Sequence, residues 1–166
     1  MSFFRTLQSL RIHNRKGVAV LIDPDKMHDE SRMKAMAELL RHTEVTAVLI
    51  GGSLLTQDHF NQCLKLAKKH LELPLVLFPG SPDQVSDHAD AILLLSLISG
   101  RNAELLIGHH VSAAPKLSKS SLEIISTGYM LVDCGNNTTA TYVSQTFPIP
   151  HHKPENDLGE HQSWRK

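Results

Sequence analysis

Five short apolar runs recur along the 166-residue chain, and they constrain its fold more than any other feature. The runs occupy residues 18–22, 46–50, 75–78, 91–95 and 122–132. Nearly continuous apolar runs of this length are typical of parallel strands that are covered on both faces. Because segments with helical spacing of apolar residues separate them, the pattern predicts an α/β protein with a parallel sheet.

The predicted helices follow from apolar residues three and four positions apart and from capping residues at their starts. The first predicted helix covers residues 3–12, and the second starts at the capping group of residues 28–31 and ends at Arg41. The third runs from Thr56 or Asp58 to Leu71, a short fourth from Ser81 to about His88, and the fifth carries Leu105 and ends near Pro115. We expect a loop over residues 96–102 and an interruption of the fifth strand at Gly128.

Composition excludes several classes of protein. The chain has 17 Lys plus Arg and 17 Asp plus Glu, so no overall basic field exists to hold nucleic acid or an anionic membrane surface. No signal peptide is recognisable, and no run approaches the roughly 20 apolar residues of a transmembrane segment, which predicts a cytoplasmic protein. Cys63 and Cys134 are far apart and form no CxxC pair, so we expect both to be packing residues.

The first apolar run ends abruptly in Asp23-Pro24-Asp25-Lys26. Ligand chemistry collects at the carboxyl ends of parallel strands, so Asp23 and Asp25 are the first residues to suspect. The structural alternative is that one carboxylate caps the following helix while the other is solvated. Five strands alone would suit a flavodoxin-like open sheet, because a βα barrel needs eight strands and roughly 250 residues.

Four strand ends carry a more specific signal. Residues 21–26 (LIDPDK), 48–53 (VLIGGS), 78–82 (FPGSP) and 126–132 (STGYMLV) resemble, in order and spacing, the geranylgeranylglyceryl/heptaprenylglyceryl phosphate synthase family. The resemblance covers about residues 10–153. It implies a TIM-barrel type of fold with about five of the eight βα units present. We therefore expect a partial barrel over residues 1–150 and a non-homologous or disordered tail over residues 151–166.

The resemblance also implies a function: Mg²⁺-dependent transfer of an isoprenyl group from isoprenyl diphosphate to sn-glycerol 1-phosphate, which forms an ether lipid precursor. On the matching positions, Asp23 and Ser53 would hold the Mg²⁺, which prefers few protein oxygens together with waters and phosphate oxygens. The candidates for substrate binding are Asp25, Lys26, Gly52 and Tyr129. No residue is assigned as the catalytic base.

Members of the family continue for roughly three more βα units, which build the glycerol phosphate site. The alternative reading is therefore an inactive fragment that retains only the metal and diphosphate half. Self-association as a homo-oligomer would be one way to cover its open sheet edge. A third reading is a flavodoxin-like receiver or binding module. The adjacent pairs His109-His110 and His151-His152 are expected to be surface residues, because neighbours in sequence do not face one another.

Overall fold

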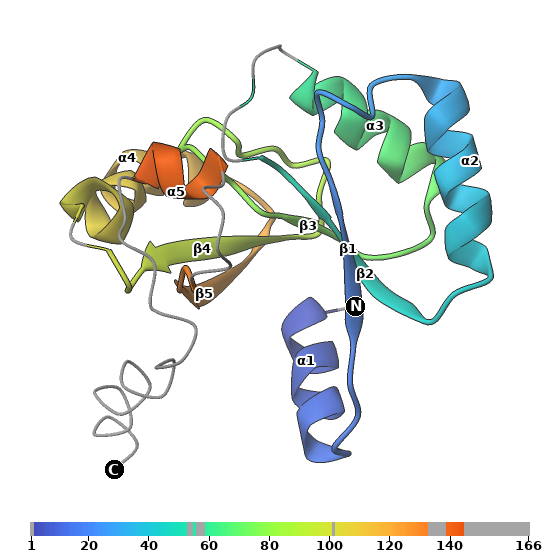
Figure 1. Cartoon of the computed structure of the whole chain (residues 1–166), viewed down its shortest axis with the longest axis horizontal. Coiled ribbons are helices and arrows are strands. Elements are labelled where there is room, and N and C mark those ends of the chain that lie inside the picture. The colour runs from blue at the N-terminus through green and yellow to red at the C-terminus, as the bar shows by residue number, and fades with distance from the viewer. Residues whose placement is uncertain (1, 53–54, 56–58, 101, 133–138, 145–166) are drawn as a thin grey trace.

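The computed structural model describes residues 2–52, 55, 59–100, 102–132 and 139–144. Within these residues five parallel strands form one sheet (Figure 1). They are β1 (Val18–Ile22), β2 (Val45–Ile50), β3 (Leu75–Leu77), β4 (Ala91–Leu97) and β5 (Glu123–Tyr129). Their spatial order is β1-β2-β3-β4-β5, so each strand pairs with the next one along the chain.

This strand order decides between the two folds considered above. A flavodoxin-like sheet has its first strand between the second and third, whereas β1 is an edge of the described sheet and pairs with β2. Sequential parallel pairing is the order of a βα barrel. The flavodoxin-like alternative is therefore wrong, and the predicted partial barrel is confirmed.

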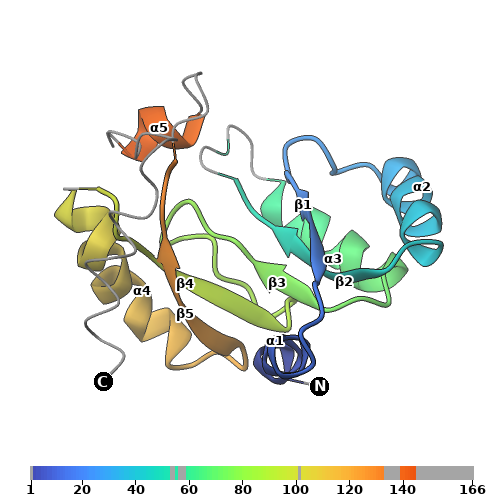
Figure 2. The ribbon, with the colours of Figure 1, turned by 60° about the horizontal axis from the view of Figure 1, so that its bottom comes forward.

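Helices follow β1, β2, β4 and β5, and one helix precedes β1. They are α1 (Phe3–Ile12), α2 (Glu30–Arg41), α3 (Phe60–His70), the π-helical turn η1 (Glu104–Gly108), α4 (His109–Leu117) and α5 (Thr139–Ser144). Helices α2 and α3 lie beside the β1–β2 end of the sheet, and α4 lies beside β4 and β5 (Figure 2). In the part of the chain that is described, no helix has the length and apolar character needed to cross a membrane.

The core has two layers, one on each face of the sheet. The larger layer lies between the sheet and α2, α3 and α4. Its large, fully buried residues include Met33, Ile50, Leu64, Leu75, Leu77 and Ile92. The smaller layer contains Phe3 of α1 together with Ala47, Val76, Ala91 and Ile125. Neighbouring residues such as Leu75 and Val76 enter different layers because side chains alternate across a strand.

Helix α1 closes the amino end of the strands. The backbone N–H of Phe3 donates to Oε2 of Glu123 at 2.6 Å, and the Ser2 hydroxyl donates to Oε1 of the same carboxylate. The hydroxyl bond, followed by the amide bonds, lowers the pKa of Glu123. The first helix is thereby fastened to the last strand of the described sheet.

The short helix predicted over residues 81–88 is wrong. This segment forms turns, closed by bonds from the N–H of Gln84 to Ser81 O and from the N–H of Val85 to Asp83 O. The physical reason is that the side chain of Gln84 turns inward and satisfies backbone groups of other turns. As a result, β3 is followed by a loop instead of a covering helix.

Other boundaries differ by a few residues. Strand β4 runs to Leu97, two residues into the predicted loop, and β5 continues through Gly128, which pairs with Ser96. Helix α4 passes Pro115 and ends at Leu117. Helix α3 begins at Phe60; the predicted starts at residues 56 and 58 lie outside the described residues.

Cys63 is buried, as predicted, and Cys134 and the predicted tail lie outside the described residues.

Candidate functional site

The strand register brings three strand ends together. Ile22 pairs with Ile50, and Ile50 pairs with Leu77, so the residues that follow them lie side by side. The ladder continues one step beyond the strands, because the N–H of Gly51 donates to Ile22 O at 3.2 Å and the N–H of Phe78 donates to Ile50 O at 2.9 Å. The predicted convergence of the ends of β1 and β2 is therefore present.

Asp23 begins a tight turn at the end of β1. Its Oδ1 accepts a hydrogen bond from the N–H of Asp25 at 3.1 Å, and its Oδ2 lies 3.5 Å from Nζ of Lys26. The side chain of Lys26 is 82% exposed, so this ion pair is weak and easily exchanged for another anion. Three of the predicted residues thus share one turn, with two carboxylates and an ammonium group.

Gly51 and Gly52 follow β2 and lie against this turn. A Cβ at Gly51 would meet the carbonyl oxygen of Phe78 at 1.9 Å, so no larger residue fits there. A Cβ at Gly52 would lie 3.7 Å from Oδ1 of Asp23, which places the backbone of Gly52 beside that carboxylate. Ser53 follows Gly52 in the sequence but lies outside the described residues.

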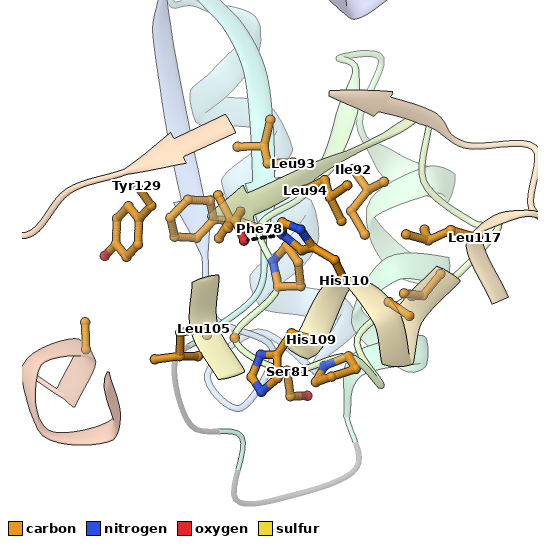
Figure 3. Close-up of a pocket in the computed structure, with 18 residues that line it drawn as sticks. Phe78, Ser81, Ile92, Leu93, Leu94, Leu105, His109, His110, Leu117 and Tyr129 are labelled. Atoms are coloured by element: carbon orange, nitrogen blue, oxygen red, sulfur yellow. Dashed lines mark hydrogen bonds between the residues drawn. The ribbon is translucent and has the colours of Figure 1, made fainter. Parts of the chain in front are cut away.

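Gly52 also lines an apolar pocket that is open to solvent, and the space inside it together with its open side is about 820 Å³. Figure 3 shows the labelled residues around this pocket. One wall is the loop after β3, with Phe78, Pro82 and Val85 among its residues, and another is β4. The third wall is helical and contributes Leu105, His109, Ala113 and Leu117, which follow one another at steps of four residues. The absence of a helix over residues 81–88 gives this pocket its loop wall.

Tyr129 lies at the same pocket, at the end of β5. Its ring meets that of Phe78 edge to face, with centroids 5.8 Å apart and an interplanar angle of 89°. Burial raises the pKa of the Tyr129 phenol, so the hydroxyl stays neutral through the physiological range. The two rings form an aromatic corner beside the pocket.

The prediction that His109 and His110 are surface residues is wrong. Both line the pocket and are half-buried, and a ring nitrogen of His110, Nε2, lies 2.7 Å from Leu95 O (Figure 3). Since a carbonyl only accepts, Nε2 is the protonated nitrogen of that ring. Both residues line the pocket because α4 begins at its edge, and the His110 ring reaches across to the carbonyl of Leu95 on β4. The second pair, at 151–152, lies outside the described residues.

Comparison with known proteins assigns this arrangement to a family. The model of the PcrB family matches residues 10–157. The chain belongs to the PcrB family. Geranylgeranylglyceryl phosphate synthase of Spirosoma linguale is 48% identical over 152 residues, an alignment that covers 90% of this chain and 59% of the relative. The family resemblance of the four strand ends is thereby confirmed.

Two solved structures share the fold of this PcrB-family chain. One is the wild-type GGGPS of Thermoplasma volcanium, with a TM-score of 0.82 and 28% identity, covering 98% of this chain and 64% of that one. The other is (S)-3-O-geranylgeranylglyceryl phosphate synthase of Thermoplasma acidophilum in complex with its substrate sn-glycerol-1-phosphate. Its TM-score is 0.77 at 28% identity, and the match covers 92% of this chain and 61% of that one. The chain therefore spans less than two thirds of the relatives it matches.

The carboxylate at the end of β1 fits the hard cation that the family resemblance implies. Asp23 has its carboxylate in the turn after β1, beside the backbone of Gly52. Mg²⁺ uses one or two carboxylates and completes its shell with waters and phosphate oxygens. Among the described residues, no group of three or more His, Cys, Asp or Glu is arranged to hold a metal.

The structure thus brings together Asp23, Asp25, Lys26 and Gly52, and places Tyr129 at the adjoining pocket. Sequence reasoning missed most of the pocket wall, because its loop residues were assigned to a helix. The four-residue repeat from Leu105 to Leu117 was a readable signal for one apolar helix face, although it did not distinguish a pocket from a packed core.

Proposed function

We propose that this chain binds an isoprenyl diphosphate with Mg²⁺ and transfers its prenyl group to the hydroxyl of sn-glycerol 1-phosphate, with the diphosphate as the leaving group. One observation supports this above all others: Gly52 lines the apolar pocket, and its backbone lies beside the Asp23 carboxylate. A molecule with a long apolar chain and a charged head matches an apolar pocket with a polar turn beside it.

The pocket would hold the isoprenoid chain. The helical wall from Leu105 to Leu117 runs through η1 and α4, and its neighbours on β4 are leucine and isoleucine. Burying a chain of methyl and methylene groups here removes apolar surface from water on both partners. The pocket also keeps water away from the reacting carbon, which protects it from hydrolysis.

The charged head would lie at the end of β1. Asp23 and Ser53 would hold the Mg²⁺, which when bound neutralises the diphosphate and makes it a better leaving group. Lys26 is free to swing, since its side chain is largely exposed, and its ammonium would contact the phosphate oxygens. Asp25 holds the turn in shape through its N–H, which donates to Asp23.

The acceptor is proposed from the relatives. The Thermoplasma acidophilum structure contains sn-glycerol-1-phosphate as its substrate, and the relatives bear the name of a glyceryl phosphate synthase. Because the chain spans 59% of the Spirosoma relative, a second function is binding of isoprenyl diphosphate without transfer. The two functions differ in whether a product forms.

A transfer assay separates them. Purified protein would be incubated with geranylgeranyl diphosphate, Mg²⁺ and radiolabelled sn-glycerol 1-phosphate, and the organic extract would be counted. Labelled, extractable product that disappears in Asp23→Asn supports the transferase. Saturable Mg²⁺-dependent binding of the diphosphate without labelled product supports binding alone, and the absence of both product and binding would refute the proposal.

A further inference from the structure

Strand β4 extends beyond its partner β3 at the wall of the pocket. The pairing of the two strands ends where Leu77 meets Ile92, whereas β4 continues past that pair. Phe78 turns its N–H to β2, where it donates to Ile50 O, and the next residue, Pro79, has no N–H to give. The chain that follows β3 therefore cannot extend the hydrogen-bond ladder along β4.

The bonds between β4 and β5 show which backbone groups of β4 face the side of β3. At one end of β4, Asp90 O accepts from the N–H of Glu123. At the other end, the N–H of Ile98 donates to Tyr129 O. Successive residues of a strand turn their backbone groups to opposite neighbours, so the even-numbered residues of β4 face β5. The carbonyl of Leu95 therefore faces the side on which β3 has already ended.

His110 supplies a donor to this carbonyl. Its ring nitrogen Nε2 lies 2.7 Å from Leu95 O, and the ring reaches it from the second residue of α4, as the dashed line in Figure 3 shows. Both residues line the pocket, so the bond joins its helical wall to its strand wall. An apolar ligand cannot donate, and without the ring it would bury a bare carbonyl at a cost in free energy.

We propose that His110 is a binding residue for the isoprenoid chain: its N–H caps the Leu95 carbonyl, so that the chain meets a wall without an open acceptor at that point. This inference rests on the proposed function, in which the pocket holds the isoprenoid. The polar ring thus makes the wall less polar than a hydrocarbon side chain in its place would.

The test exchanges the ring for side chains with and without a donor. Farnesol without Mg²⁺ probes the pocket alone, and calorimetry on the full chain would compare wild type with His110→Leu and His110→Gln. Leucine is apolar but cannot donate, so we expect farnesol affinity to fall about tenfold, because one acceptor is left unpaired under the ligand. The amide of glutamine donates as the ring does, so His110→Gln should lie within about threefold of wild type.

A residue that only fills space predicts the opposite sign. In that case leucine at position 110 would add apolar surface, and His110→Leu would bind farnesol as tightly as wild type or more tightly. Either result would overturn the inference. An equal loss in His110→Gln and His110→Leu would also overturn it, because the loss would then follow the shape of the ring and not its N–H.

His13→Leu is the matched control. His13 also has a ring nitrogen, Nδ1, close to a backbone carbonyl, that of Ser9, at 2.8 Å. It lies exposed at the C-cap of α1 and is not among the residues that line the pocket. His13→Leu should bind farnesol as wild type does. A loss as large as that of His110→Leu would mean that binding weakens through general stability, and the inference would be wrong.

A measurement on wild type needs no variant. The neutral ring of His110 should carry its proton on Nε2, and nitrogen NMR spectra should show the proton there with and without farnesol. A proton on Nδ1, or loss of the Nε2 bond when farnesol binds, would overturn the inference.

Farnesyl diphosphate with Mg²⁺, measured on the same proteins, keeps the two proposals apart. If wild type and His110→Leu bind it and farnesol equally well, this inference alone fails. If wild type binds neither ligand, the proposed function fails first and this inference falls with it.

Discussion

At the scale of single residues, Asp23 carries the account. Its carboxylate lies beside the backbone of Gly52, which lines the pocket, and it stands at the end of β1 as the sequence predicts. Asp25 shares the turn but serves it through its backbone N–H. The two acids of the Asp-Pro-Asp sequence therefore have different tasks in the proposed site.

Tyr129 offers a prediction about pH at this scale. Burial raises the pKa of its phenol above the ordinary value near 10. In Tyr142→Phe, where Tyr129 is the remaining tyrosine of the two in the chain, the phenolate absorbance at 295 nm should rise with a midpoint above pH 10. Farnesol in the pocket should move the midpoint further upward. A midpoint at or below 10 would contradict the burial of this ring.

Residue types explain how much of the site was predictable. Asp23 and Asp25 were readable because a strand end needs no long-range contact to be recognised, whereas Lys26 and Gly52 became candidates only through the family resemblance. Gln84 was not readable, because its partners are backbone groups 4 and 32 residues away. The helix predicted there failed for the same reason: a single inward side chain overrode good local capping residues.

At the scale of elements, α2 and α3 are joined at their exposed ends by Glu30. Its Oε1 lies 2.8 Å from Nζ of Lys69 and 2.9 Å from Nε2 of His70. The bond from Lys69 and then that from His70 lower the pKa of Glu30 to about 2. In the unfolded chain a glutamate titrates near 4.3, so the folded state binds this proton more weakly.

The sign of the pH dependence follows from that lowering. The stabilisation by Glu30 is present in full above about pH 4.3 and is lost as the pH falls towards 2. We expect the Tm of wild type to exceed that of Glu30→Gln at pH 6, and the difference to disappear near pH 2. Glu44→Gln, a change at an exposed residue before β2, should show no such trend. A difference that stays constant from pH 6 to pH 2 would refute the assigned contacts.

The packing of α3 on the sheet gives a second prediction for an element. Leu64 is fully buried in the larger core layer, so Leu64→Ala should lower the free energy of unfolding by about 2–5 kcal/mol in urea. Leu39 on α2 is 66% exposed, and Leu39→Ala should change it by less than about 1 kcal/mol. Similar effects of the two substitutions would mean that α3 does not pack as described.

Elements were the most predictable level of this molecule. The strands and the helices α1 to α4 were read from apolar period, because burial on a parallel sheet imposes that period directly. Strand β4 extends two residues beyond its predicted end at residue 95, because Ser96 and Leu97 pair with Gly128 and Tyr129 of β5. No local pattern encodes this contact. Gly128 stays in its strand for the same reason.

At the scale of the whole molecule, the pocket is a product of topology. It exists because β3 is followed by a loop, so the space between β4 and α4 is not filled by a helix. The strand order that excludes a flavodoxin-like sheet could not be read from composition, and it was the resemblance of four strand ends that indicated a barrel. Fold and pocket thus depend on pairings between distant segments.

Pocket length should set the preferred chain length of the ligand. Ala113 is a small, buried residue in the helical wall, between His109 and Leu117. Ala113→Phe would fill part of the pocket, so we expect the affinity for geranylgeranyl diphosphate to fall by at least about tenfold while that for geranyl diphosphate changes by less than about threefold. Ala114→Phe, at an exposed neighbour, is the control. Equal losses for both ligands would place the chain elsewhere.

The central claim is that the Asp23 turn and the apolar pocket are two ends of one binding site. The most direct measurement is the dissociation constant of farnesyl diphosphate with and without Mg²⁺, for wild type and for Asp23→Asn, with Asp83→Asn as a control at an exposed carboxylate. We predict that Mg²⁺ tightens binding at least about tenfold in wild type and in Asp83→Asn but not in Asp23→Asn, while farnesol binds all three alike. Equal Mg²⁺ dependence in Asp23→Asn and wild type would contradict the account.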